Sequence, residues 1–487
     1  MEIRVRFAPS PTGYLHVGGL RTALYNYLFA KKNNGKMILR IEDTDRTRLV
    51  ANAQENLIDA LKWAGIDYDE GPDSPGNYGP YVQSERLEIY KKYALELVDK
   101  GKAYYAFDTT VEIDAMRKAS SETFGAKYNR YAMRNSFTLG EIETQKLLDS
   151  NSDYVIRLFV PFNEEVIFAD RIRGEVRVST NDIDDQVLLK SDGFPTYHLA
   201  NVVDDHLMKI SHVIRGEEWL PSTPKHVLLY QYFSWQVPEF AHLPLLLNKD
   251  KSKLSKRQGS VAVEDFRDKG YLRDAFVNFI ALLGWNPFAD REIYNINELI
   301  EFFNLDKVNK GGAVFDTQKL DWMNQQYLKS ANADDFITEI SDIIYKKFGK
   351  VFSDDYLKKI FNLFKERITF VSQIPEIAEY MFTDIKEYDL DYMKKRWLDD
   401  SESLMLQLIE KYNTIDSFTH DDISNITKDF ANHNGKKLGD IIHPIRLMIT
   451  GIASGASMFH TMEILGKNNC IDRMKLFLNS KPYSNNG

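Results

Sequence analysis

The sequence predicts an α/β protein: a doubly wound parallel sheet with an inserted α+β module, followed by an all-α second half. Strand and helix patterns alternate from residue 3 onward, which is typical of doubly wound sheets. Short β-rich runs within residues 154–180 then interrupt this alternation. From about residue 320 the hydrophobic pattern is helical almost throughout, with breaks about every 15 to 20 residues, as in helix bundles.

Two strand–helix units open the chain. Buried strands are predicted over residues 3–8 and 37–41, and the helix between them ends at Gly35. Further helices are predicted around Leu57 and just before Gly101. The apolar face of the first helix follows a spacing of three and four, at Leu20, Ala23, Leu24, Tyr27 and Leu28.

The middle of the chain is richer in strands. Runs at residues 154–156, 166–168 and 175–178 predict the strands of the inserted module. Strands at residues 188–189 and 212–214 flank a helix and mark the return of the α/β pattern.

Composition limits the class of protein. A chain of 487 residues is too long for one simple core, so about two to four domains are expected. A hydrophobic content of 43% and a charged content of 27% exclude a disordered or fibrous chain. The net charge of −9 excludes a generally basic coat for nucleic acid, although a local basic strip remains compatible with it.

Cysteine content and hydropathy predict the compartment. The single cysteine, Cys470, excludes an intrachain disulfide framework and a Cys₄ metal site. The chain opens without a basic-then-apolar leader, and no apolar run approaches the ~18 residues of a membrane span. We therefore expect a cytoplasmic protein that does not contact a membrane.

A proline- and glycine-rich loop over residues 9–19 separates the first strand from the first helix. Its glycines allow the backbone to approach a ligand, and the helix that begins near Gly18 offers N–H groups and a positive dipole end to an anion. His16 stands beside this helix end and can stabilise charge on a triphosphate. The residues alone fit a triphosphate site and an ordinary turn with a surface histidine about equally.

A second motif, at residues 251–260, places four basic residues within seven positions, between serines and before Gly259. Such a segment can bring ammonium groups to phosphates. Taken alone, it fits a solvated basic loop better.

The two motifs together resemble the paired signatures of class I aminoacyl-tRNA synthetases, and the match is closest to the bacterial-type glutamyl-tRNA synthetase family. The resemblance runs from residue 3 to about 330 and continues more weakly to about 478. Beyond His16-Val17-Gly18-Gly19 and Lys253-Leu254-Ser255-Lys256-Arg257, the matching segments are residues 4–13, 39–46, 192–206, 213–219, 282–285 and 315–324.

The resemblance implies ATP-dependent ligation of L-glutamate to tRNA(Glu) through a glutamyl-adenylate, with Mg²⁺ entering with ATP. It also implies a Rossmann-like catalytic domain and a monomer. The expected parts are residues 1–100 and 191–250 (catalytic), 101–190 (inserted module for the tRNA acceptor stem), 251–325 (connecting domain with the basic loop) and 326–487 (helical, anticodon-binding).

Site residues follow from the same resemblance. The expected catalytic residues are His16, Lys253 and Lys256. The expected ATP contacts are Gly18, Gly19, Lys253, Ser255 and Lys256. The expected glutamate contacts are Arg6, Ala8, Ser10, Glu42, Tyr197, Asn201 and Arg215.

Several of these residues have a plainer interpretation. Arg6 and Glu42 could form a structural ion pair between adjacent strands, and Arg215 could tie its strand to Glu217 or Glu218. The resemblance favours the substrate site in both cases. For Asp43 and Asp45, a surface or helix-capping role is favoured over metal binding.

The chain departs from the family pattern at the zinc site. Several members carry Cys-x-Cys after the Ala-Tyr-Tyr stretch, whereas this chain has Ala106-Phe107-Asp108 there. Zinc requires Cys or His ligands. We therefore expect no metal bound by the protein itself.

The C-terminal region is expected to read tRNA. Residues 431–487 contain seven Lys/Arg and three Asp/Glu, a local charge of +4 that suits an RNA backbone. A solvated helical face is the plainer interpretation.

Three other functions share some of these features. They are a truncated paralogue that glutamylates a tRNA base, a non-catalytic tRNA-binding protein and a small-molecule nucleotidyltransferase. The long helical half and the intact basic and histidine motifs disfavour them. Whether tRNA(Gln) is also charged stays open.

Overall fold

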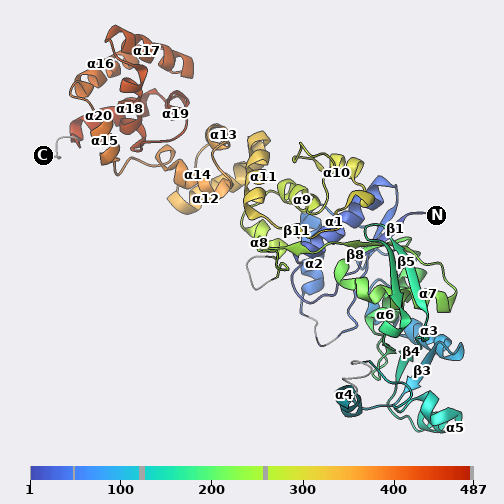
Figure 1. The fold of residues 1–487 in the computed structure, drawn as a ribbon. Helices are drawn as coiled ribbons and strands as arrows, with labels where there is room; N and C mark the ends of the chain where they lie inside the picture. The colour runs from blue at the N-terminus through green and yellow to red at the C-terminus, as the bar shows by residue number, and fades with distance from the viewer. Residues whose placement is uncertain (1, 46, 48–49, 120–126, 256–260, 483–487) are drawn as a thin grey trace. The chain divides into compact units, whose positions relative to one another are not determined.

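The computed structural model describes residues 2–45, 47, 50–119, 127–255 and 261–482 (Figure 1). The chain divides into two compact units, residues 1–320 and 321–487, and each is described by itself. The finer division into five parts stays a prediction.

The first unit mixes helices and strands. Its helices are α1 (Val17–Lys32), α2 (Ala53–Trp63), α3 (Leu87–Asp99), α4 (Thr110–Ala119), α5 (Ser136–Asp149), α6 (Tyr197–Leu207), α7 (Thr223–Phe233), α8 (Val263–Asp268), α9 (Arg273–Ala281) and α10 (Ile296–Phe302). Its strands are β1 (Arg4–Phe7), β2 (Lys36–Leu39), β3 (Ala103–Ala106), β4 (Val155–Leu158), β5 (Glu165–Asp170), β6 (Gly174–Ser179), β7 (Val187–Leu189), β8 (His212–Gly216), β9 (Glu239–Leu243), β10 (Leu246–Leu247) and β11 (Ala313–Val314).

Parallel strand pairs form the centre of this unit. β1 pairs in parallel with β2, with α1 between them in the chain, and β8 pairs in parallel with β9, with α7 between them. The backbone before β8 also meets β1, because the Ser211 N–H donates to the Arg4 carbonyl at 2.9 Å. Residues at the carboxyl ends of both strands, Phe7 and Gly216, line one cavity, so these two ends lie near one another. The mixed α/β first half with parallel strands is confirmed.

The strand-rich middle is divided between two sheets. β3, β4 and β7 form a separate antiparallel sheet, as a module inserted into the chain would. β5 and β6 instead join β9 and β8 in the order β6-β5-β9-β8, through the parallel pair Asp170 and Phe240. This differs from the prediction that residues 166–168 and 175–178 belong to the inserted module. Local pattern marks a strand, but its partner is set by contacts far along the chain.

Helix α1 packs its apolar face into the core of the first unit. Four of its predicted apolar positions are fully buried, while Tyr27 is only half-buried. Tyr25 is fully buried instead, and its hydroxyl donates to the Ala281 and Leu283 carbonyls at 3.0 Å. The helix is thereby fixed with its N-terminus at the end of β1.

The second unit is helical wherever its described residues have regular structure, which confirms the largely helical second half. α11 (Thr317–Ser330) leads into it. Its other α-helices are α12 (Ile337–Phe348), α13 (Asp354–Phe364), α14 (Ile374–Ile377), α15 (Leu390–Arg396), α16 (Ser401–Asn413), α17 (His420–His433), α18 (Leu438–Thr450), α19 (Met458–Leu465) and α20 (Lys467–Ser480). In the described part of the chain, no helix has both the length and the apolar character needed to cross a bilayer.

Candidate functional site

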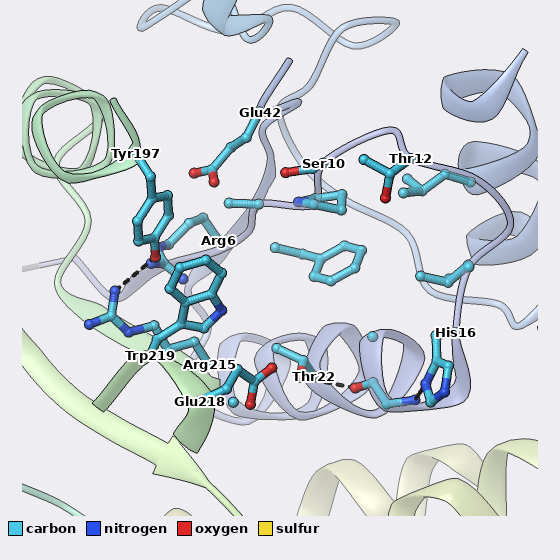
Figure 2. Close-up of a pocket in the computed structure, with 18 of the residues that line it drawn as sticks. Arg6, Ser10, Thr12, His16, Thr22, Glu42, Tyr197, Arg215, Glu218 and Trp219 are labelled. Carbon is cyan, nitrogen blue, oxygen red and sulfur yellow. Dashed lines mark hydrogen bonds between the residues drawn. The ribbon is translucent and has the colours of Figure 1, made fainter. Parts of the chain in front are cut away.

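A cavity of about 290 Å³ opens where β1 and β8 end and α1 begins. Ligands of such sheets bind at the carboxyl ends of the strands. Figure 2 shows Arg215, Tyr197 and Trp219 at one side of the cavity and His16 at the other. The predicted site residues that line it are Arg6, Ala8, Ser10, His16, Gly18, Gly19, Glu42, Tyr197, Asn201 and Arg215.

The N-terminus of α1 forms one wall. His16 is the N-cap, and its Nδ1 accepts from the Gly18 N–H at 3.0 Å. A Cβ atom on Gly19 would lie 2.9 Å from Leu15 Cδ1, so a larger residue here would displace the end of the Leu15 side chain. Because Nδ1 accepts, a neutral His16 carries its proton on Nε2. The helix end thus combines backbone N–H groups, a positive dipole end and a ring donor.

The first loop is bonded to the segment that directly follows the second basic motif. The Val17 N–H donates to the Val261 carbonyl, and the Val263 N–H donates to the Leu15 carbonyl, both at 2.9 Å. The first loop is therefore joined at the start of α1 to a segment that lies far away in the sequence.

The basic motif itself is only partly described. Lys253 pairs across a short hairpin with Leu247 and is exposed, whereas Ser255 is half-buried. Neither is among the residues that line the cavity. Lys256 lies outside the described residues.

A buried ion-pair cluster supports the floor of the cavity. Asp205 accepts from Arg6 Nε at 3.1 Å and from Arg40 Nη1 at 2.7 Å, and Arg40 Nη2 donates to Glu42 Oε1 at 3.0 Å. The structure therefore pairs Arg6 with Asp205 and Glu42 with Arg40, so the considered Arg6–Glu42 ion pair is wrong. All four side chains are at most 7% exposed.

Burial and the two guanidinium groups act in opposite directions on these carboxyls. Burial raises the pKa of Glu42, and the nearby Arg40 and Arg6 only partly offset this. For Asp205 the effect of burial is outweighed by Arg6 and Arg40, which bond it directly, and its pKa is lowered.

Arg215 is buried differently. It is 4% exposed, yet no carboxylate of the described residues lies within ion-pair distance of it. Its Nη1 donates to the Tyr197 hydroxyl at 3.0 Å. Glu217 instead pairs with Arg173 and accepts from the Leu245 N–H. A tie from Arg215 to Glu217 is thus absent from these contacts.

A buried amide nitrogen in the cavity wall lacks a hydrogen-bond partner. Asn201 is 2% exposed and lines the cavity, and its Nδ2 has no hydrogen-bond partner in the structure. A buried donor without a partner costs about 1–3 kcal/mol, so this atom is ready to bond a ligand oxygen.

The acidic residues beside Glu42 bond protein groups. Asp43 Oδ1 accepts from the Ser84 N–H at 2.8 Å, and Asp45 Oδ1 accepts from the Thr47 hydroxyl at 2.7 Å. Among the described residues, no group of three or more His, Cys, Asp or Glu side chains is placed to hold a metal ion.

Hydrogen bonds occupy the position where zinc-containing relatives begin their metal site. Asp108 accepts from the Arg134 N–H at 2.6 Å and from the Tyr128 hydroxyl. Asn135 donates to the Arg130 and Met133 carbonyls. These contacts join Asp108 and Asn135 to neighbouring described residues. The absence of zinc stays a prediction.

A family model described as the catalytic domain of class I tRNA synthetases (E and Q) matches residues 2–322. The chain belongs to the class I tRNA synthetases of the E and Q type. A second family model, an anticodon binding domain, matches residues 327–478.

Similarity to relatives extends over nearly the whole chain. A glutamate–tRNA ligase from Chloroherpeton thalassium is 49% identical over 99% of this chain and 98% of its own length. One from Chlorobaculum parvum is 48% identical over 97% of both chains. The crystal structure of a glutamate tRNA ligase from Elizabethkingia meningosepticum in complex with its amino acid matches with a TM-score of 0.93 and 42% identity, covering 99% of this chain and 100% of that chain.

The sequence prediction of the site missed two residues that line the cavity, and also Arg40, which bonds Glu42 but does not line the cavity. Trp219 and Glu218 line the cavity, and the Trp219 ring packs against Tyr197, tilted by 34° with centroids 4.2 Å apart. Both follow β8 directly, at the edge where ligands bind, which was the available signal. Arg40 was also missed, although its spacing of two from Glu42 puts both side chains on one face of an extended segment.

Proposed function

We propose that this chain ligates L-glutamate to tRNA(Glu), using ATP and a glutamyl-adenylate intermediate. Its near full-length similarity to glutamate–tRNA ligases confirms the family and the ligase activity expected from the sequence. The roles of individual residues are proposed from the geometry of the cavity.

One observation carries the amino-acid site: Arg215 is a buried cation that forms no ion pair with a carboxylate of the described residues. A substrate carboxylate supplies the missing charge, and a guanidinium suits it because it bonds in a planar fork. Asn201 Nδ2 offers a further donor beside it. Glu42, in the same cavity, is proposed to hold the substrate ammonium, and Arg6 to contribute positive charge from below.

Three smaller features complete this pocket. Ala8 and Ser10 bring the backbone after β1 close to the substrate, and Tyr197 holds Arg215 in place through its hydroxyl. Glutamine lacks the charge that Arg215 requires, so the pocket selects the carboxylate over the amide.

The adenylation step needs positive charge where phosphate oxygens gain negative charge. A glutamate carboxylate oxygen bonds to the α-phosphorus while the bond from that phosphorus to pyrophosphate breaks. The Gly18 and Gly19 backbone at the start of α1, with His16, is proposed to hold the phosphates. Lys253, Ser255 and Lys256 are assigned to ATP by the family resemblance, and Mg²⁺ enters with ATP as part of the substrate.

The second step transfers the glutamyl group to tRNA. The terminal ribose hydroxyl attacks the adenylate carbonyl, and AMP leaves. The anticodon binding domain matched at residues 327–478 and the local charge of +4 over residues 431–487 support tRNA binding by the second unit.

We further propose that β1, β2, β8 and β9 belong to one doubly wound, Rossmann-like layer. The parallel pairs and the helices between their strands support this. A cytoplasmic location and a monomeric state remain proposals from the sequence.

Of the other functions considered, the truncated paralogue is disfavoured most directly. Such paralogues lack the helical half, whereas this chain matches an anticodon binding domain over residues 327–478.

Aminoacylation of purified tRNA(Glu) and tRNA(Gln) tests the function. Charging of tRNA(Glu) with glutamate is expected, and its absence overturns the proposal. The tRNA(Gln) reaction decides whether the enzyme discriminates between the two tRNAs.

Lys256→Ala tests the adenylation step. Because the charge is needed most in the transition state, kcat for adenylate formation should fall far more than tRNA affinity. An unchanged rate of pyrophosphate exchange, measured with tRNA present, would contradict the role of Lys256.

A further inference from the structure

Side chains from three neighbouring strands lead to Arg215 in a line of hydrogen bonds. Asp170 ends β5, His242 lies on β9, and Arg215 lies on β8 directly opposite His242 in the strand register. Asp170 Oδ2 lies 2.6 Å from His242 Nδ1, and Arg215 Nε donates to His242 Nε2 at 3.0 Å. All three side chains are at most 4% exposed.

Asp170 fixes which nitrogen of His242 carries the proton. A carboxylate only accepts, so the proton lies on Nδ1 and leaves a lone pair on Nε2 for Arg215. Burial, only partly offset by Asp170, lowers the pKa of His242 to about 4, so the ring is neutral at pH 7. Asp170 also accepts from the Ile172 and Arg173 N–H groups, at 2.9 and 2.8 Å.

A second buried histidine, His226, also contacts the guanidinium and is itself in contact with a further side chain. His226 Nδ1 lies 3.3 Å from Arg215 Nη1, and its Nε2 lies 3.1 Å from His198 Nδ1. Burial first, and Arg215 second, lower the pKa of His226, so this ring is neutral too. Arg215 Nη2 donates to the Thr223 hydroxyl at 2.9 Å.

Among the described residues, every acceptor of the Arg215 guanidinium is therefore neutral. A carboxylate in direct contact would orient the group equally well, but it would also cancel the charge that attracts a substrate anion. A neutral histidine orients the guanidinium and leaves its charge available. Since burying a cation without a counter-charge is costly, the arrangement has value only if an anion completes it.

We infer that His242 is a positioning residue for glutamate: held in one tautomer by Asp170, it orients Arg215 toward the substrate carboxylate without neutralising it. This inference rests on the proposed function and adds a specificity-determining residue to it. His242 does not line the cavity, so it acts through Arg215 and not on the substrate.

Two variants of similar size and polarity separate this role from a structural one. The amide of Gln reaches the position of histidine Nε2, so His242→Gln can still accept from Arg215. The shorter amide of Asn reaches only the Nδ1 position, so His242→Asn keeps a contact with Asp170 and loses the one with Arg215. His242→Asn should raise the KM for glutamate about 10- to 100-fold, the loss expected for a hydrogen bond to a charged group.

The same measurements on His242→Gln should give a glutamate KM within about threefold of the unchanged chain. For both variants, the KM for ATP and kcat at saturating glutamate should change little. His212→Leu is the control, because His212 is another buried histidine of this sheet, on β8, but lies at the far end of that strand from Arg215. It should lower the melting temperature and leave the glutamate KM unchanged.

The outcomes separate a failure of the proposed ligase function from a failure of the positioning role of His242. If the unchanged chain does not charge tRNA with glutamate, the proposed function fails. If it does, but His242→Asn only lowers the melting temperature, the positioning role is overturned. Should His242→Asn not fold, His242→Gln decides: a tenfold rise in its glutamate KM overturns the inference.

Discussion

Two buried arginines near the cavity are held in opposite ways. Arg40 is fully buried and bonds Asp205 and Glu42, and Asp204 lies 3.7 Å from its Nε. Arg215 is almost as deeply buried and, within the described part of the chain, bonds only neutral acceptors. Burial removes water from both guanidiniums at a cost in free energy, but only for Arg40 do ion pairs within the protein offset that cost.

The difference separates a group that holds the fold from a group that serves a ligand. The Arg40 cluster joins β1, α6 and the segment after β2 through ion pairs between oppositely charged side chains. At Arg215 the neighbouring side chains fix the orientation of the guanidinium but do not neutralise its charge. Substitutions can therefore disrupt the two arginine sites separately. Disrupting the Arg40 cluster should lower the unfolding free energy, and disrupting the Arg215 site should raise the KM for glutamate.

The largest effect is expected from Asp205→Ala. It leaves Arg6 and Arg40 short of a buried counter-charge, which typically costs about 3–5 kcal/mol of unfolding free energy. Urea unfolding measures this loss. Asp114→Ala removes an exposed partner of Arg117 3.6 Å away and should cost under about 1 kcal/mol. Equal losses in the two variants would contradict the distinction.

The same variant predicts a dependence on pH. Because Asp205 has its pKa lowered in the folded state, its contribution to stability is present above the ordinary carboxyl pKa of 3.8. That contribution is lost as the pH falls through the still lower folded value. The unfolding free energies of the unchanged chain and Asp205→Ala should thus differ fully at pH 7 and converge only in strong acid.

Arg215→Ala should break the other half of the comparison. The apparent binding free energy of glutamate should weaken by about 2–5 kcal/mol, read as a rise in its KM. Discrimination against glutamine should also be blunted, while ATP affinity changes little. Since no carboxylate is left unpaired, the melting temperature should fall less than in Asp205→Ala. A fall in melting temperature with an unchanged glutamate KM would instead show a structural role.

Tyr197→Phe sharpens the comparison with a smaller change. It removes one neutral acceptor of Arg215 and keeps the ring that packs against Trp219. The loss of one hydrogen bond to a charged group predicts a rise in glutamate KM of about tenfold. An effect on the KM for ATP of the same size would show that the ring has been displaced.

The smallest effect is expected from metal removal. Hydrogen bonds of Asp108 and Asn135 close the loop where related proteins use zinc. Treatment with a chelator should leave the melting temperature unchanged, and elemental analysis should find no stoichiometric zinc. One zinc per chain would mean that other ligands form a site.

Local pattern predicted the elements that position the site. The strand before Pro9, the helix after Gly18 and the strand that leads to Arg215 all follow from hydrophobic periodicity and turn residues. Placing a glycine-rich loop at a helix N-terminus was enough to locate one wall. The family resemblance supplied the other lining residues.

What could not be predicted depends on distant partners. Residues 166–168 read as part of a separate module, so Asp170 had no apparent link to His242, which it meets only because β5 lies beside β9. Arg40 and Asp205 are likewise separated by most of the first unit. A periodic pattern says which face of a strand is buried, but not which strand lies next to it.

The hydrogen bonds from residues 15–17 to Val261 and Val263 have a consequence for how the protein is made. At synthesis rates of about 5–20 residues per second, roughly 13 to 50 s pass before residue 263 has been added. During that time the loop at the start of α1 lacks its backbone partners. The nascent chain thus carries an unfinished site, and its contacts of long sequence separation should make completion of the first unit slow.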